Sequence, residues 1–151
     1  MRRVLITGMS ATGKSTALGV LAKRGFRVVD TDEPGWKERR GDEEVWREER
    51  ISELLSGEDG GALFVSGCVS NQGRFYDRFD AVVLLSAPAD VILERIASRT
   101  TNRYGKDPAE RELVLADLAA VEPLLRETAT HEIDATLPVA EVVEQLIAIG
   151  R

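Results

Sequence analysis

The chain has 151 residues, of which 43% are hydrophobic and 30% are charged, a balance typical of one soluble globular domain. Its net charge of −6 argues against a nucleic-acid-binding surface, and no apolar run approaches the ~20 residues needed to cross a bilayer. The single cysteine excludes an internal disulfide, and the single histidine disfavours a zinc site. We therefore expect a cytoplasmic protein, monomeric or homodimeric, that has neither nucleic acid nor membrane as a partner.

Apolar runs and helical patterns alternate along the whole chain. In chain order we expect a strand at 2–7, a helix at 14–24, a strand at 26–30, a helix at 43–57, strands at 62–67 and 80–87, a helix at 88–99, a helix that begins with Asp107 as its N-cap, a strand at 131–135 and a helix at 138–150. The strands are rich in Val, Ile and Leu with little alternation, which indicates a parallel sheet covered by helices on both faces. The predicted fold class is therefore α/β, with ligands bound beyond the carboxyl ends of the strands.

The stretch GMSATGKST follows the first expected strand and leads into the first expected helix. It fits G-x-x-x-x-G-K-[ST], the Walker A motif, together with the strand and helix that this motif requires. Glycines let the backbone curl so that successive N–H groups face phosphate oxygens, and the helix adds its positive end. Lys14 is expected to reach the outer phosphates, and the Ser15 hydroxyl to ligate Mg²⁺. The nucleotide-binding residues expected are Gly8, Ser10, Ala11, Thr12, Gly13, Lys14, Ser15 and Thr16.

The run VLITGMSATGKST, followed by VVDTD, resembles the small P-loop kinases of the shikimate kinase and nucleoside monophosphate kinase group, within the P-loop NTPase superfamily. The resemblance extends over essentially the whole chain in element order and length. It implies a single domain, 1–151, with a five-stranded parallel sheet flanked by helices in three layers. It also implies a substrate-binding segment at about 33–60, a mobile lid at about 99–107, and passage of the chain at 134–138 beside the adenine of ATP.

Two carboxylates, Asp30 and Asp32, close the second expected strand. Carboxylates at a strand end can face Mg²⁺ or accept a hydrogen bond from a substrate hydroxyl, although a polar turn would also place aspartates there. The neighbouring phosphate loop favours the functional interpretation. Similarity to shikimate kinases implies that Asp32 binds the acceptor hydroxyl and that Asp30 supports the water shell of the metal.

The expected helix 43–57 carries Trp46 and Arg47. In the resembling kinases an aromatic–arginine pair at a similar place binds an anionic acceptor, which maps onto these two residues. A solvated, charged helix with one buried tryptophan explains the segment equally well.

The third expected strand ends at Ser66 and Gly67. Adenylate-kinase-like members would carry an aspartate at this strand end, so the chain is closer here to the Gly-rich turn of shikimate kinases. Asn71 is a further candidate for the lining of the acceptor pocket, whereas Cys68 is expected to be a small buried residue. The acceptor-binding residues expected are Asp32, Arg47, Gly67 and Arg74.

The segment RIASRTTNRYGK, residues 95–106, contains four basic residues and no acid within an acidic chain. Arg95 and Arg99 share a helix face at i,i+4 spacing, where like charges repel each other unless an anion lies nearby. A lid that closes on the phosphates and neutralises the charge of the transition state accounts for this cluster, and a solvated basic patch is the alternative. The catalytic residues expected are Lys14, Asp32, Arg99 and Arg103.

The sequence thus predicts a kinase that transfers the γ-phosphoryl group of ATP, with Mg²⁺, to a small molecule. The acceptor is left open between a shikimate-like acid, a nucleoside, a nucleotide and an antibiotic hydroxyl. A nucleotide-binding regulator or a simple ATPase without an acceptor is the alternative.

Overall fold

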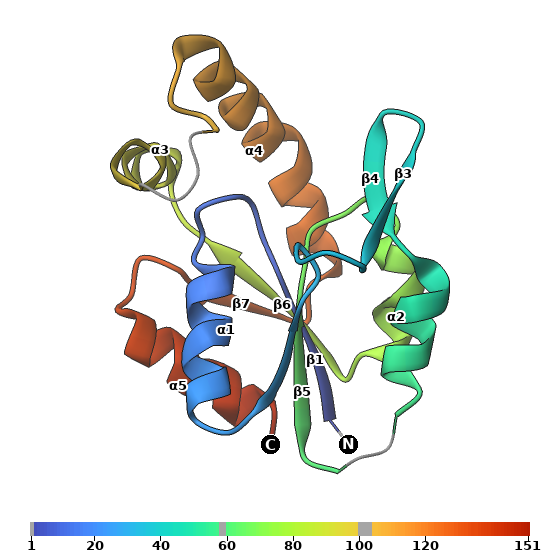
Figure 1. Cartoon of the computed structure of the whole chain (residues 1–151). Helices are drawn as coiled ribbons and strands as arrows, with labels where there is room; N and C mark the ends of the chain where they lie inside the picture. Colours follow the sequence, from blue (N-terminus) through green and yellow to red (C-terminus); the bar gives the residue numbers. More distant parts are fainter. Residues whose placement is uncertain (1, 58–59, 100–103) are drawn as a thin grey trace.

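The computed structural model describes residues 2–57, 60–99 and 104–151, and its centre is a five-stranded sheet (Figure 1). The strand order is β2-β5-β1-β6-β7, and every neighbouring pair is parallel. The strands are β1 (Arg2–Thr7), β2 (Arg27–Asp30), β5 (Ala62–Ser66), β6 (Ala81–Ser86) and β7 (His131–Asp134). The predicted α/β fold with a five-stranded parallel sheet is confirmed.

Helices cover both faces of this sheet. They are α1 (Lys14–Lys23), α2 (Glu48–Leu55), α3 (Ala89–Ser98), α4 (Pro108–Thr128) and α5 (Val139–Ile149), with a 3-10 helix, η1 (Gln72–Arg78). The start of α4 has the expected cap, since the Asp107 carboxylate accepts from the Glu110 backbone N–H at 2.9 Å. The predicted N-cap of this helix is therefore confirmed.

Alternate residues of the central strand separate two apolar clusters. Val4 and Ile6 pack with side chains of α1, α3, α4 and α5, whereas Leu5 packs with side chains of α2, η1 and Trp46. All three β1 residues are fully buried. Both faces of the sheet are thus covered, which explains the near-continuous apolar runs in the strands.

The segment predicted as one helix at 43–57 is instead a β-hairpin followed by a shorter helix. Strands β3 (Lys37–Arg40) and β4 (Glu43–Trp46) pair antiparallel around Gly41 and Asp42, and Gly41 has φ +67°. Arg39 lies opposite Glu44 and Arg40 opposite Glu43, so opposite charges face each other across the hairpin. A two-residue turn of this composition is a hairpin signal that the helical interpretation passed over.

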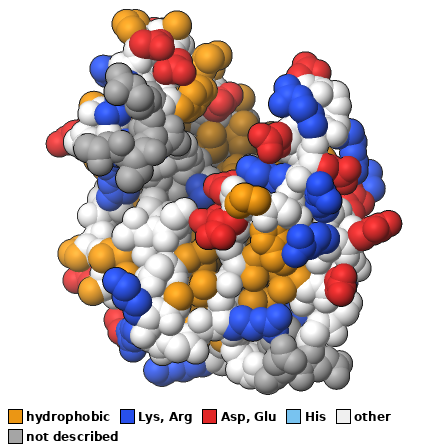
Figure 2. Space-filling model, in the orientation of Figure 1, with side chains coloured by type: hydrophobic (Ala, Val, Ile, Leu, Met, Phe, Trp, Pro, Cys, Tyr) orange, Lys and Arg blue, Asp and Glu red, His pale blue; other side chains and the backbone are white. Residues whose placement is uncertain are grey.

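The carboxyl ends of the strands meet at the edge of the sheet where α1 begins. The β3–β4 hairpin and the upper part of α4 rise on either side of this edge (Figure 1), and the surface between them is hollowed (Figure 2). Within the described ranges, none of the helices combines the length and apolarity needed to cross a bilayer.

Candidate active site

The loop between β1 and α1 is shaped by two glycines, Gly8 and Gly13. Gly13 is the N-cap of α1 with φ +91°, a left-handed conformation that glycine adopts without cost, and the first turn of α1 contains no acid. A side chain at Gly8 would place a Cβ 2.5 Å from the Leu85 carbonyl oxygen, so the loop can lie against β6 only with glycine there. The first N–H groups of α1 have no partner within the helix and form a ready anion site.

The Lys14 ammonium lies against this loop. It donates to the Gly8 carbonyl at 2.6 Å and to the Met9 carbonyl at 3.0 Å. Burial lowers the pKa of Lys14, while the charges of Cys68, Asp32 and Asp30 act in the opposite direction. A partly desolvated cation that donates to two neutral carbonyls would gain strongly from an incoming phosphate.

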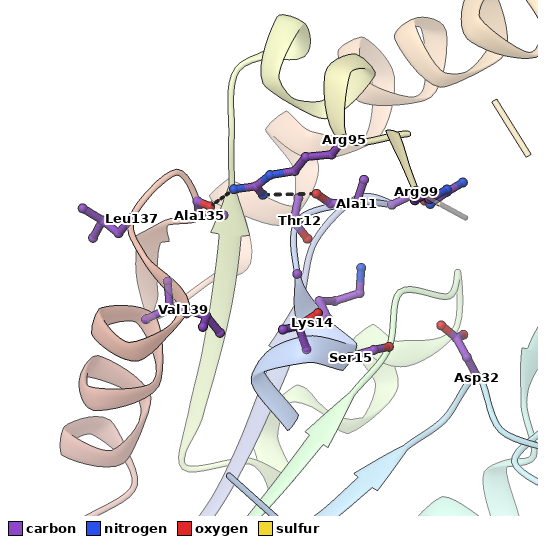
Figure 3. Close-up of a pocket in the computed structure, with 14 residues that line it drawn as sticks. Ala11, Thr12, Lys14, Ser15, Asp32, Arg95, Arg99, Ala135, Leu137 and Val139 are labelled. Carbon is purple, nitrogen blue, oxygen red and sulfur yellow. Dashed lines mark hydrogen bonds between the residues drawn. The ribbon is translucent and has the colours of Figure 1, made fainter. Parts of the chain in front are cut away.

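A cavity of about 520 Å³ opens over the loop (Figure 3). It is lined by Ser10, Ala11, Thr12, Gly13, Lys14, Ser15, Thr16, Asp32, Arg95, Arg99, Ala135, Leu137, Val139 and Val142. Most of the expected nucleotide-binding residues therefore share one space with Asp32 and Arg99. Ala135 and Leu137 lie in the 134–138 segment that was expected beside the adenine, and with Val139 and Val142 they form an apolar end.

Arg95 spans the top of this cavity, a position that the sequence did not reveal. Its guanidinium donates to the Ala11 carbonyl at 3.2 Å and to the Ala135 carbonyl at 2.5 Å (Figure 3). Ala11 has φ +65°, which is rare for a residue other than glycine. Arg95 thus joins the phosphate loop to the β7–α5 connection, and it stabilises the unusual backbone at Ala11.

Two hard oxygen ligands meet at the start of α1. The Ser15 hydroxyl donates to the Asp30 carboxylate at 2.9 Å. Mg²⁺ is usually held by one or two protein oxygens together with water and phosphate oxygens, so this pair fits the ion. The described residues contain no group of three or more His, Cys, Asp or Glu that could hold a metal ion. A bound Mg²⁺ would therefore need water and phosphate oxygens as its other ligands.

Comparisons with known proteins identify the family of the chain. A family model described as AAA domain matches residues 4–116. A shikimate kinase of Oleidesulfovibrio alaskensis is 30% identical to the chain, with 99% of this chain and 97% of the relative covered. The chain belongs to the shikimate kinase-like P-loop kinases. It is an ATP-dependent phosphotransferase that acts on small molecules, as the sequence predicted.

Solved structures of other kinases show the same fold. A shikimate kinase from Bacteroides thetaiotaomicron has a TM-score of 0.71 at 19% identity, and covers 98% of this chain and 97% of its own. A gluconokinase from Sinorhizobium meliloti has a TM-score of 0.69 at 22% identity, and covers 98% and 90%. The three-layer arrangement is therefore that of the small P-loop kinases.

Asp32, the expected acceptor contact, is the second residue after β2. Its carboxylate forms an ion pair with Lys37 at 3.0 Å, and its backbone N–H donates to the Asp30 carboxylate at 3.0 Å. Lys37 is the first residue of β3, so the hairpin brings a cation to the expected acceptor contact. This pairing crosses the 33–36 turn and was not predicted.

Trp46 and Gly67 pack against each other, next to Thr31. Trp46 is fully buried, and its indole N–H donates to the Thr31 hydroxyl at 2.9 Å. A Cβ on Gly67 would lie 3.0 Å from the Trp46 ring and closer still to Thr31. The expectation that Trp46 contacts an acceptor is wrong, because the indole is enclosed. The alternative, a solvated charged helix with one buried tryptophan, is confirmed for the buried indole and wrong for the helix, because Trp46 is the last residue of β4. The predicted acceptor contact of Gly67 stays a prediction.

The expected basic acceptor ligands have partners outside the nucleotide cavity. The Arg47 Nε donates to the Lys37 carbonyl at 3.2 Å, and Arg74 lies 3.5 Å from the Glu48 carboxylate. Asn71 is nearly buried and bonds both the N–H and the C=O of Trp46, so it fixes the backbone between β4 and α2. Roles of Arg47 and Arg74 in acceptor binding stay predictions.

The lid expected at about 99–107 is described in part. Arg99 donates to the Ser10 hydroxyl at 3.3 Å and to the Tyr104 carbonyl at 2.7 Å, so it already touches the phosphate loop. Arg103, the other expected catalytic arginine, lies outside the described residues. Cys68, expected to be buried, is only half-buried.

Proposed function

We propose that this kinase transfers the γ-phosphoryl group of Mg²⁺-bound ATP to an alcohol hydroxyl of a small acceptor. The observation that carries the proposal is the single cavity that unites the phosphate loop with Asp32 and two arginines. A donor phosphate held by the loop would lie between cations on one side and a carboxylate on the other. Such a site positions the reactants and stabilises charge, which is most of what phosphoryl transfer requires.

Each residue then has a distinct task. Lys14 exchanges its two loop carbonyls for phosphate oxygens, and Arg99 approaches the transferring group from the Ser10 side. Asp32 accepts the hydrogen bond of the acceptor hydroxyl and takes its proton as the oxygen bonds to the γ-phosphorus and ADP leaves. Ser15 and Asp30 would hold Mg²⁺, which supplies charge neutralisation at the phosphates when bound.

The apolar end of the cavity suits the nucleobase. Leu137, Val139 and Val142 offer a surface against which a planar base can pack, next to the backbone of Ala135. Arg95 connects this apolar end to the phosphate loop, because its guanidinium donates to the carbonyls of both Ala135 and Ala11. We expect a cytoplasmic enzyme, where the half-buried Cys68 stays reduced, and a monomer or homodimer.

The test is an ADP-release screen with ATP and Mg²⁺ over hydroxy acids, polyols, nucleosides and nucleotides. We expect a hydroxyl-bearing small molecule to raise turnover above the acceptor-free rate, and Asp32→Asn to remove that rise while nucleotide binding persists. Asp42→Asn, an exposed aspartate in the hairpin turn, is the matched control and should behave as the parent. If no acceptor raises turnover, a nucleotide-binding regulator or simple ATPase replaces this proposal.

A further inference from the structure

Gln72, the first residue of η1, encloses its carboxamide between η1, the end of β1 and the segment after β5. The side chain is buried, and its Nε2 donates to the Thr7 hydroxyl at 3.0 Å and to the Tyr76 hydroxyl at 2.9 Å. Its Oε1 accepts from the Val69 backbone N–H at 3.0 Å. Both amide hydrogens and the amide oxygen therefore have partners, as a buried amide requires.

The contact with Thr7 holds the residue that precedes the phosphate loop. Thr7 is the last residue of β1 and is fully buried, so water cannot replace Gln72 at its hydroxyl. The next residue is Gly8, whose carbonyl accepts from the Lys14 ammonium at 2.6 Å. Gly8 also lies against β6, where a Cβ would be 2.5 Å from the Leu85 carbonyl oxygen. The first residue of the loop thus rests on β6, and Gln72 fixes the residue before it.

The same carboxamide also joins this strand end to the segment after β5. The Gly67 backbone N–H donates to the Ile6 carbonyl at 3.1 Å, so this segment continues along β1 beyond the end of β5. Two residues later, the Val69 N–H is bound by Gln72. A single buried side chain therefore restrains the ends of two neighbouring strands against each other.

We propose that Gln72 is a positioning residue that keeps the phosphate loop in the conformation that binds phosphate. This inference rests on the part of the proposed function in which the loop holds the phosphates of the nucleotide, and it is independent of the acceptor. Gln72 itself does not line the nucleotide cavity, so it acts through Thr7 and not by contact with the ligand. A loop whose conformation is already fixed needs no ordering when phosphate binds, whereas a loosened loop must be ordered first.

Two hydroxyl deletions separate positioning from a general contribution to stability. Thr7→Val removes the partner on the loop side and Tyr76→Phe the partner within η1, so each variant leaves one hydrogen of the same amide without its acceptor. We expect Thr7→Val to raise the Kd of MgADP about tenfold, the effect of one hydrogen bond, and to leave the Kd of adenosine, which has no phosphate, unchanged. Gln72→Met, which keeps the length of the side chain without its hydrogen bonds, should do the same. Tyr76→Phe is the matched control and should keep both parental Kd values.

Calorimetry measures the Kd of MgADP, NMR titration measures the Kd of adenosine, and the Tm of each variant shows whether it folds. If Thr7→Val or Gln72→Met unfolds, the other variant decides. A parental ratio of the two Kd values in the folded variant overturns the positioning role. An equal loss of MgADP affinity in Tyr76→Phe overturns it as well, because the effect would then follow from any loosening around the amide. If the parent binds MgADP no more tightly than adenosine, the phosphate loop does not hold phosphate, and the proposed function falls together with this inference.

Discussion

Gly67→Ala tests how tightly Gly67 packs against Trp46 and Thr31. The new Cβ would lie 3.0 Å from the Trp46 ring and closer to the Thr31 hydroxyl, both of which are fully buried and cannot move into solvent. Overpacking of this kind costs about 2 kcal/mol in the free energy of unfolding. For a domain of this size that corresponds to a fall in Tm of about 4–8 °C.

The assay is thermal unfolding followed by circular dichroism without ligand, so that the change reports packing and not acceptor binding. Gly19→Ala is the matched control, because Gly19 lies inside α1 and its Cβ would meet nothing within 4 Å. Alanine is the better helix former by about 1 kcal/mol, so this control should raise Tm. A Gly67→Ala protein that melts at or above the parent temperature would refute the packing argument.

Three further predictions concern charge. Lys14→Met should lower kcat by at least about 10²-fold, because the lost cation stabilises the phosphate charge in the transition state. It should not lower Tm, because the buried ammonium is partly desolvated in the free protein. Turnover at the parental rate would contradict this prediction. Arg95→Met should weaken ADP binding about tenfold, because the variant loses the hydrogen bonds to the carbonyls of Ala11 and Ala135. Calorimetry measures the Kd, and an unchanged Kd would show that these two hydrogen bonds are not needed for nucleotide binding. The Arg126 guanidinium, with help from a serine hydroxyl, holds the pKa of Glu132 below its ordinary value near 4.5. The contribution of this carboxylate to the free energy of unfolding is therefore present above that value and is lost as the pH falls through the lowered pKa. In urea unfolding, the free energy of unfolding of Glu132→Gln should fall less between pH 6 and pH 3 than that of the parent.

The phosphate loop could be predicted from sequence because its chemistry is local. Each property of Gly13, Lys14 and Ser15 depends on neighbours a few residues away, and the flanking strand and helix confirm the motif. The role of Arg95 depends instead on carbonyls 84 and 40 residues away in the chain. The sequence showed a basic cluster there, but only the packing of α3 determines which arginine bridges the two loops.

The hairpin was missed for a different reason. Residues 43–57 have enough charged residues and leucines to satisfy a helical period, and that pattern obscured the turn at Gly41. The pairing of Arg40 with Glu43 is a cross-strand contact that a helical interpretation hides. Lys37 is the first residue of β3 and forms an ion pair with Asp32. Because the sequence analysis missed this hairpin, it also missed this contact with Asp32.

The burial of Trp46 gives the molecule a built-in optical probe. The chain has two tryptophans, and the other, Trp36, is half-buried with the Arg50 guanidinium 4.5 Å from its ring centre. The enclosed indole should emit at shorter wavelength than the partly hydrated one, and neither lines the nucleotide cavity. Fluorescence excited in the indole band therefore reports the hairpin and the turn before it. An acceptor that contacts the hairpin should therefore change the emission more than nucleotide does, and no attached dye is needed.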